Sequence, residues 1–514
     1  MAKEIELKLR LPPRQALAFS RHLAIISGSA NKTRLFNTYY DTPEHDLARR
    51  GIALRLRRQG WAVWLMTVKG GTAGAGGLAQ RSEWEAPTQP GVFDFGIVTD
   101  AGLRGFLEAR QARLQPVFTT DFTRTAWQIE RAGALVEVAL DRGKISADDP
   151  PARDSGERLP RSEPLCEVEL ELVAGDAPDA LFELAIEFAR EVPLHPEIAS
   201  KAERGYALAD RSLRQPLKGF ASPVNEKMSP VDAFRAIALA CLSQLQRNEA
   251  GAIAGGNPEY VHQARVAIRR LRSALKLFAP VLSPPFVGVY SPRWRELASQ
   301  LGGARDWDVF LDETLAPLEE AFPGDPDLAQ LRARSEKIKA RAQIAAGKAL
   351  TQPLYSQLLL AFAAALFRVE PPTIAAHGKL SGVSMRKFAR RRLSKRASMI
   401  AALVAEHGKM NAERRHELRI AFKKLRYAIE FFAPLLPGKP LEKYQASLSR
   451  IQDLLGILND QVSASRLIKQ MHPKDDPAPL TRGWIAGRTQ LLVADLTEEL
   501  REFVALKEPW RQKS

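Results

Sequence analysis

The sequence predicts a multidomain α+β chain in which a β-rich domain precedes an all-α domain. Short alternating segments such as GIALRLRRQ, WAVWLMTVKG and GALVEVALDRG, separated by turn residues, fill residues 1–210 and are typical of strands. From about residue 229 onward the apolar period lengthens to that of helices, in stretches rich in Ala, Leu and Arg. Residues 211–228 are rich in Pro, Ser and Gly and show no periodicity, so we expect a linker there.

The positive charge of the chain is concentrated in its second part. The formal net charge is +16, with 75 Lys and Arg against 59 Asp and Glu. Residues 1–210 hold 27 basic and 30 acidic residues, so 48 basic and 29 acidic residues remain for 211–514. A surplus of about +19 over the second part favours a polyanionic partner such as nucleic acid, an acidic membrane surface or a phosphate polymer.

Other features of the composition indicate a protein of the cytoplasm. The two cysteines, Cys166 and Cys241, provide neither a disulfide framework nor the spacing of a zinc finger. The N-terminal residues lack the layout of a signal peptide, and the most apolar run, LLLAFAAALF at 358–367, is shorter than the roughly 20 residues of a membrane helix. We therefore expect cytoplasmic localisation and no insertion into a membrane.

Charged residues recur at every second position in the strand-like segments and so lie on one face of each strand. In the first segment, MAKEIELKLR, two carboxylates and an ammonium share a face, and apolar residues occupy the other. The charged residues that share faces in this way are Glu4, Glu6, Lys8, Arg55, Arg57, Arg81, Glu83, Glu85, Glu137, Asp141, Glu167, Glu169 and Glu171. A solvated face would mix Lys, Glu, Thr, Ser and Gln, whereas here carboxylates and arginines cluster.

Clustered carboxylates repel one another unless a cation lies among them, and ligand sets made only of oxygen suit Mg²⁺ or Mn²⁺. Arginines and lysines in the same space suit phosphate oxygens. On the inner face of a closed sheet, both groups together would form a site for a metal-bound polyphosphate. No Ser/His/Asp or Cys/His arrangement competes for a catalytic role in residues 1–210.

An ordered set of motifs over residues 1–210 resembles the CYTH domain. The set comprises the N-terminal E-x-E-x-K, YYDTP at 39–43, LRLR at 54–57, TVKG at 67–70, E-x-E at 83–85, CEVELEL at 166–172 and SKAERGY at 200–206. The resemblance implies a triphosphate tunnel metalloenzyme: an eight-stranded antiparallel β-barrel with a charged lumen, in which glutamates hold one or two divalent ions and basic residues bind the triphosphate.

The resemblance also implies roles for individual residues. The leading metal carboxylates are Glu4, Glu6, Glu167 and Glu169, and the further candidates are Glu83, Glu85, Glu137, Asp141 and Glu171. The catalytic, phosphate-binding residues are Lys8, Arg55, Arg57, Lys69, Arg124 and Lys201, with Arg81 and Arg204 as secondary candidates. The expected cofactor is Mg²⁺ or Mn²⁺, and the expected substrate is inorganic triphosphate, which would be hydrolysed to diphosphate and phosphate.

Three alternatives to this activity remain open. An adenylate cyclase would use the same metal site and would also need an adenine pocket. A thiamine or nucleoside triphosphatase is the second alternative. A mainly non-catalytic protein that binds polyphosphate granules is the third.

The helical part contains an internal repeat. Residues 261–280 and 415–434 align without gaps at an offset of 154, with nine identities in twenty positions. The register continues where LGGARD at 301–306 aligns with LGILND at 455–460. We therefore expect two copies, at about 231–310 and 385–464, packed about a pseudo-twofold axis in one bundle that spans 229–510.

Each copy carries a basic stripe. At 100° per residue, the stripe residues fall within an arc of about 80°, well separated from the apolar arc. The stripe of the first copy consists of His262, Arg265, Arg269, Arg272 and Lys276, and that of the second consists of His416, Arg419, Lys423 and Arg426. Glu430 occupies the position that corresponds to Lys276, so we expect the two copies to differ in binding.

The duplicated pattern H-x-x-R-x-x-x-[RK]-[RK]-L-R resembles the CHAD domain. The resemblance implies that the basic stripes bind inorganic polyphosphate, with the paired histidines His262 and His416 at matching positions. The partners expected for this part are long-chain polyphosphate or polyphosphate granules. We expect polyphosphate to be preferred over nucleic acid, because the stripes lack interleaved aromatic residues on which bases could stack.

Overall fold

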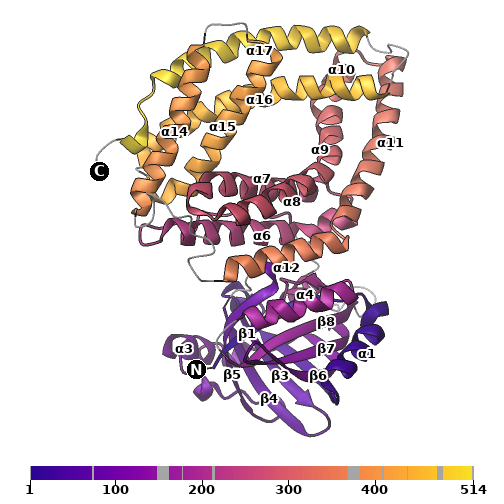
Figure 1. Cartoon of the computed structure of the whole chain (residues 1–514). Coiled ribbons are helices and arrows are strands. Elements are labelled where there is room, and N and C mark those ends of the chain that lie inside the picture. Colours follow the sequence, from indigo (N-terminus) through magenta and orange to yellow (C-terminus); the bar gives the residue numbers. More distant parts are fainter. Residues whose placement is uncertain are drawn as a thin grey trace. The chain divides into compact units, whose positions relative to one another are not determined.

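The computed structural model of the chain describes residues 2–71, 75–147, 161–175, 178–210, 215–368, 383–406, 410–436, 438–471 and 479–511. The first four residues of the expected linker, 211–214, lie outside these ranges. The chain divides into two compact units, shown in Figure 1. The barrel unit comprises residues 1–215 and 352–369, and the helical unit comprises residues 216–351 and 370–514.

The barrel unit contains an antiparallel sheet that closes on itself. The sheet follows the order β5-β4-β3-β2-β6-β7-β8-β1, and β1 also pairs with β5, so that eight strands form a barrel. The strands are β1 (Ala2–Arg10), β2 (Asn31–Asp41), β3 (Ile52–Gln59), β4 (Val63–Gly70), β5 (Leu78–Pro87), β6 (Gln115–Arg131), β7 (Ala134–Ala147) and β8 (Arg161–Ala174). The short β9 (His195–Pro196) adds to β1 outside the ring. The expected eight-stranded barrel is confirmed.

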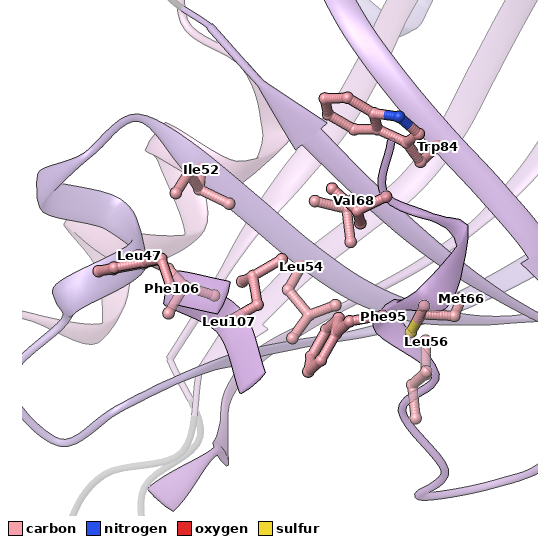
Figure 2. Packing of buried hydrophobic residues seen from close by; sticks show 11 residues of the cluster. Leu47, Ile52, Leu54, Leu56, Met66, Val68, Trp84, Phe95, Phe106 and Leu107 are labelled. Atoms are coloured by element: carbon pink, nitrogen blue, oxygen red, sulfur yellow. The ribbon is translucent and has the colours of Figure 1, made fainter. Parts of the chain in front are cut away.

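The outer face of β3, β4 and β5 is covered by protein. Helices α2 (Asp46–Arg49) and α3 (Ala101–Glu108) and the turn at Phe95–Ile97 pack against it. Figure 2 shows this apolar cluster, in which Leu54 and Leu56 of β3 meet Phe95 and Leu107. Because successive side chains of a strand point to opposite faces, burial of the leucines turns the intervening arginines of β3 into the lumen. The charged face is therefore the inside of the barrel.

Three further helices belong to residues 1–210. They are α1 (Ala16–Ser27), α4 (Asp179–Glu191) and α5 (Lys201–Ala209). Helix α5 packs against β6 and β7, where Tyr206 meets Phe118 edge-to-face at a ring separation of 5.2 Å. This packing brings the first residue of α5, Lys201, to the barrel lumen.

Helix α12 (Pro353–Phe367) belongs to the barrel unit although its residues lie within the range expected for the helical domain. It packs against α4, where Phe182 stacks on Phe367 at a ring separation of 5.7 Å. It also contacts β9, where His195 Nδ1 and Ser356 Oγ are 2.8 Å apart. The compact units therefore do not follow the chain order, because the apolar face of α12 is buried against the barrel.

The helical unit contains two related halves. Its helices are α6 (Pro230–Ala254), α7 (Pro258–Phe278), α8 (Pro284–Gln300), α9 (Gly302–Val309), α10 (Ala316–Ala321), α11 (Pro326–Ala349), α14 (Met385–Ala405), α15 (Ala412–Phe432), α16 (Gly438–Met471) and α17 (Pro479–Ala505). The repeated segments form α7 and α15, which pack against each other (Figure 1). Phe278 and Phe432, which correspond at the offset of 154, meet edge-to-face at 5.8 Å. The expected all-α region is confirmed.

Within the ranges that the structure describes, no single helix is both long enough and apolar enough to cross a membrane. One bent pair, α11 with α12, satisfies the length and composition requirements when the two helices are taken together.

Candidate functional site

The barrel encloses a cavity of about 880 Å³ with a densely charged wall. The charged side chains that line it are Lys8, Arg55, Arg57, Lys69, Arg81, Arg124, Lys201, Glu4, Glu83, Glu85, Glu169 and Glu171. Seven of these are basic and five are acidic, so the wall carries a positive surplus when all are ionised. Such a cavity suits a compact polyanion, with or without a cation.

Toward β4 and β5, one cluster of charges follows from the strand register. Lys69 of β4 lies opposite Glu83 of β5, and its Nζ atom is 2.7 Å from Glu4 Oε1 and 3.1 Å from Glu83 Oε2. Arg55 Nη2 is 3.7 Å from Glu83 Oε1 and 3.9 Å from Glu85 Oε2. The long arginine contacts leave its guanidinium able to bind another anion.

A second cluster lies deeper, around Lys201. The Lys201 Nζ atom is 2.7 Å from Asp141 Oδ2, 2.5 Å from Glu167 Oε1 and 2.9 Å from Glu169 Oε1. Arg124 donates two hydrogen bonds of 2.8 Å to Asp141 and a third to Glu169. The ammonium of Lys201 is thus enclosed by three carboxylates, with a side chain only 7% exposed.

Local sequence explains why Lys201 is held so firmly at the start of α5. Ser200 caps the helix by accepting a hydrogen bond from the backbone N–H of Glu203, and the Glu203 carboxylate accepts one from the N–H of Ser200. This reciprocal arrangement satisfies two N–H groups at the helix start. Gly205 allows α5 to approach β6, because a Cβ atom there would lie 2.1 Å from the Phe118 ring.

Lys8 and two supporting residues, Asn37 of β2 and Thr120 of β6, complete the deep part of the site. Lys8 Nζ lies 3.1 Å from Glu6 Oε1 and 3.5 Å from Glu169 Oε1. Arg57 Nε donates a 2.9 Å hydrogen bond to Asn37 Oδ1, and the Asn37 amide donates in turn to Thr120 Oγ1. Asn37 and Thr120 are completely buried, so they fix the arginine rather than contact a ligand.

The pKa shifts reflect this balance of burial and charge. Burial raises the pKa of Glu169, but Lys201, Lys8 and Arg124 outweigh it and hold this pKa well below its usual range. Burial lowers the pKa of Arg57 to about 10, and the nearby charges of Arg55 and Arg124 add to the effect. Burial raises the pKa of Glu171 to about 7, and the negative charge of Glu4 adds to it.

In the helical unit, a smaller cavity of about 190 Å³ lies between the two copies of the repeat. Its wall contains corresponding residues from both copies, paired at the offset of 154: Arg265 with Arg419, Arg305 with Asn459, Asp306 with Asp460, Val309 with Ser463 and Phe310 with Ala464. His262 and Arg269 also line it. Residues of both basic stripes therefore line one cavity, to which the second stripe contributes Arg419.

The two copies contribute unequally to this cavity. His262 lines it and is half-buried, whereas His416, its counterpart, is exposed and is absent from the wall. Arg269 lines it and donates a 2.5 Å hydrogen bond to Tyr427, whereas its counterpart Lys423 does not line it. Burial, with the charges of Arg419 and Arg269, lowers the pKa of Lys423 to about 7.

Comparison with known proteins identifies both parts of the chain. The model of the CYTH domain matches residues 2–206, and the model of the CHAD domain matches residues 236–469. The chain carries a CYTH domain followed by a CHAD domain. The inorganic triphosphatase of Haemophilus influenzae is 34% identical over 215 residues, which cover 41% of this chain and 56% of that protein's length.

Two further proteins are similar to this chain. An uncharacterized protein of Mycobacterium tuberculosis is 29% identical over 486 residues, which cover 90% of this chain and 87% of that protein. The solved structure of the CHAD domain from the plant Ricinus communis is 31% identical, with a TM-score of 0.48, over 57% of this chain and 98% of that chain. The mycobacterial relative thus matches this chain across both the CYTH and the CHAD domain.

The CYTH barrel brings most of the residues singled out in the sequence into one cavity. All six leading phosphate-binding candidates line it, as do five of the carboxylates: Glu4, Glu83, Glu85, Glu169 and Glu171. Glu6, Asp141 and Glu167 are buried beside it and bind its basic side chains, as noted above. Glu137 is half-buried and does not line the cavity. Arg204, a secondary candidate, pairs with Glu167 at 3.0 Å.

Two groups of carboxylates differ in their fitness for a divalent cation. Oxygen atoms of Asp141, Glu167 and Glu169 lie within 4.8 Å of one another, but the Lys201 ammonium already lies among them. In contrast, Glu171 lies opposite both Glu6 of β1 and Glu137 of β7 in the strand register. Among the described side chains, no basic group is within ion-pair distance of Glu171 or Glu137. Like charges directly across a sheet repel, so a cation beside Glu171 and Glu137 would relieve their repulsion, while Glu6 is already paired with Lys8 at 3.1 Å.

Arg81 is more prominent in the CYTH cavity than the sequence indicated. Its side chain is 9% exposed, its Nε atom is buried without a hydrogen bond, and it pairs with no described carboxylate. Tyr39 also lines the cavity; burial raises its pKa, but Arg55 and other nearby cations lower it overall. Alternation places Tyr39 on the same face as Asn37 and Asp41 of β2, and this pattern in the sequence could have predicted that Tyr39 faces the lumen.

The CHAD cavity also contains residues that the stripes did not reveal. Arg305 and Asp306 belong to α9, and Asn459 and Asp460 belong to α16. The repeated LG-x-x-x-D segments contain all four residues, and this repetition could have predicted that they belong to the site. Gly302 of the same segment lies against α7, because a Cβ atom there would be 3.0 Å from Arg265 Nη1.

Proposed function

We propose that the CYTH barrel hydrolyses inorganic triphosphate to diphosphate and phosphate with a divalent cation, and that the CHAD domain binds polyphosphate. The observation that carries the proposal is the cavity wall with seven basic side chains, of which Arg81 lacks a described carboxylate partner. The similarity to the Haemophilus triphosphatase over the CYTH region supports the choice of substrate.

A triphosphate resists attack because its own oxygens repel a nucleophile, so catalysis requires that their charge be neutralised. Arg55 and Arg57 lie on β3 and Arg81 lies on β5, while Lys8, Arg124 and Lys201 line the same cavity from β1, β6 and α5. Guanidinium groups bind phosphate oxygens in a forked manner, whereas ammonium groups act as point charges. These residues would hold the substrate within the lumen.

The carboxylates Glu4, Glu6 and Glu171 are the residues that we propose to hold Mg²⁺ or Mn²⁺. A bound divalent cation would orient the phosphates and lower the pKa of a water molecule. The raised pKa of Glu171 supports this assignment, because it reflects burial and an excess of negative charge that a cation would relieve. Glu83 and Glu85 pair with Arg55, and Glu83 also pairs with Lys69, so both would position these cations. Glu4 would exchange its own 2.7 Å contact with Lys69 for the metal ion.

The deciding experiment is release of phosphate from tripolyphosphate, ATP and long-chain polyphosphate, measured side by side with Mg²⁺ and with Mn²⁺. We expect tripolyphosphate to be the best substrate and Glu4→Gln or Glu6→Gln to abolish most turnover. Arg55→Ala and Arg57→Ala should impair turnover far more than Arg58→Ala, a control on the same strand that faces outward and is exposed. Equal activity of the Arg57 and Arg58 variants would refute the proposal.

An organic triphosphate is the second candidate, and one feature of the cavity favours it. Ile97, Leu172 and Val173 form an apolar part of the wall beside the charged side chains. This surface could accept a nucleoside or thiamine group. Faster hydrolysis of ATP or thiamine triphosphate than of tripolyphosphate would select this candidate.

The proposal for the CHAD domain is carried by the cavity between the repeats. It collects His262, Arg265, Arg269, Arg305 and Arg419 around only two carboxylates. Asp306 is itself paired with Arg466 at 2.9 Å. Binding of long-chain polyphosphate there would place the protein on polyphosphate granules of the cytoplasm, which microscopy of a tagged chain would test.

A further inference from the structure

The basic stripe of α7 continues beyond the CHAD cavity, and the stripe of α15 does not. Along α7, His262, Arg265 and Arg269 line the cavity, and the same face then presents Arg272 and Lys276. Lys276 lies 14 positions after His262, which corresponds to about 21 Å along the helix axis at about 1.5 Å per residue. The cavity itself has a volume of about 190 Å³ and covers only the first part of this path.

Around the end of α7, positive charges gather without carboxylates. Arg272 and Lys276 lie near Arg295 of α8 and Lys424 of α15. Burial lowers the pKa of Lys276, and the charges of Arg272, Lys424 and Arg295 add to the effect. None of these four side chains has an ion pair or hydrogen bond with another described side chain. The group therefore repels itself and would be stabilised by a bound anion.

At the corresponding end of α15, the charge is neutralised. Glu430 occupies the position that matches Lys276, and its Oε1 atom is 3.1 Å from Arg426 Nε. Arg426 is the counterpart of Arg272. Glu430 Oε2 also lies 3.9 Å from Arg270 Nη2. A polyanion that followed α15 beyond the cavity would therefore meet a carboxylate and an arginine that is already paired.

We infer that long polyphosphate leaves the central cavity in one direction only, along α7 over Arg272 and Lys276, and that Glu430 closes the equivalent path along α15. This inference rests on the proposed binding of polyphosphate and adds a polarity that the pseudo-symmetry of the repeat would not produce. A short oligophosphate occupies the cavity alone, and a long chain also contacts the group at the end of α7. Chain length is thus recognised by one copy of the repeat.

The pseudo-symmetry supplies matched variants for the test. We would measure binding of fluorescent long-chain polyphosphate and of tripolyphosphate to the full chain in EDTA, in an Arg55→Ala/Arg57→Ala background that suppresses binding by the barrel. Arg272→Ala and Lys276→Glu should weaken binding of the long chain by about tenfold and reduce its dependence on salt, because contacts that release counterions are lost. Both variants should bind tripolyphosphate within about twofold of the parent. Circular dichroism would verify folding.

Arg426→Ala is the control for Arg272→Ala, and Glu430→Lys is the control for Lys276→Glu. We expect Arg426→Ala to bind the long chain within about twofold of the parent, because the Arg426 charge is already paired with Glu430. We expect Glu430→Lys to strengthen binding of the long chain. Equal loss in Arg272→Ala and Arg426→Ala, or no loss in Lys276→Glu, would overturn the inference while leaving polyphosphate binding intact. Absence of binding by the parent chain would overturn both.

Discussion

Replacement of Lys201 by Met tests the charge balance of the barrel most directly. The substitution removes an ammonium that lies within 2.9 Å of Asp141, Glu167 and Glu169 but keeps the apolar stem. Each carboxylate retains another basic partner: Asp141 keeps Arg124, Glu169 keeps Arg124 and Lys8, and Glu167 keeps Arg204. The free energy of unfolding should therefore fall by about 3 kcal/mol, the lower end of the range for removing one partner of a buried ion pair.

The stability lost in Lys201→Met should depend on pH, and the pKa shifts of the carboxyls give the direction. In the parent, burial raises the pKa values of Asp141 and Glu169, but ion pairs hold both below normal, so their stabilisation is present at neutral pH and is lost as the pH falls. In Lys201→Met the same carboxyls lose a cation, and their pKa values rise. The stability difference between variant and parent should therefore narrow as the pH falls below neutrality.

Amide hydrogen exchange of peptides from β7 and β8 is the appropriate assay, because it reports on the barrel separately from the helical unit. The variant should exchange faster at neutral pH, and Mg²⁺ should slow exchange in the variant more than in the parent, since loss of the ammonium lets a cation approach three carboxylates whose oxygens lie within 4.8 Å of one another. Lys69→Met is the control, because Lys69 contacts two carboxylates nearer the solvent. Unchanged exchange in Lys201→Met would refute this account of the buried cluster.

Two further predictions concern α5 and the basic stripe of α15. Gly205→Ala should destabilise the barrel by about 2 kcal/mol, because the new Cβ would lie 2.1 Å from Phe118. Gly105→Ala in α3 is the control: its Cβ would meet open space, and the free energy of unfolding should rise by up to about 1 kcal/mol. Thermal unfolding that ranks the two variants the other way would contradict the packing. Burial and two arginines lower the pKa of Lys423 to about 7. Polyphosphate binding should therefore weaken between about pH 6 and about pH 8, as the ammonium loses its proton. In titration calorimetry, Lys423→Arg should remove most of this pH dependence, because arginine stays charged. An unchanged profile in Lys423→Arg would show that Lys423 does not contribute.

The fold class followed from local patterns that are physically simple. Alternation in β1 and β3 separates charged from apolar residues, and the apolar faces must be covered. The repeat offset of 154 makes Arg265 equivalent to Arg419 and Asp306 equivalent to Asp460, and two copies of one sequence fold alike. The residue types of the barrel lumen could be predicted for the same reason.

Only the tertiary structure decided which charges meet. Lys201 and Asp141 are 60 residues apart in the sequence, and they form an ion pair only because α5 packs against β6 and β7. The alignment of Glu6, Glu171 and Glu137 depends on the register of three strands, and a shift of one residue would turn these side chains to the other face.

The difference between His262 and His416 shows the same limit in the helical unit. Both histidines occupy equivalent positions in the repeat, yet one lines the cavity and the other is exposed. Likewise, α12 lies within the chain segment of the helical domain and packs on the barrel. By itself the sequence determined which faces are charged and which residues are equivalent, because both depend on local periodicity. The pairing of charges and the exposure of equivalent residues depended on long-range packing, which periodicity does not encode.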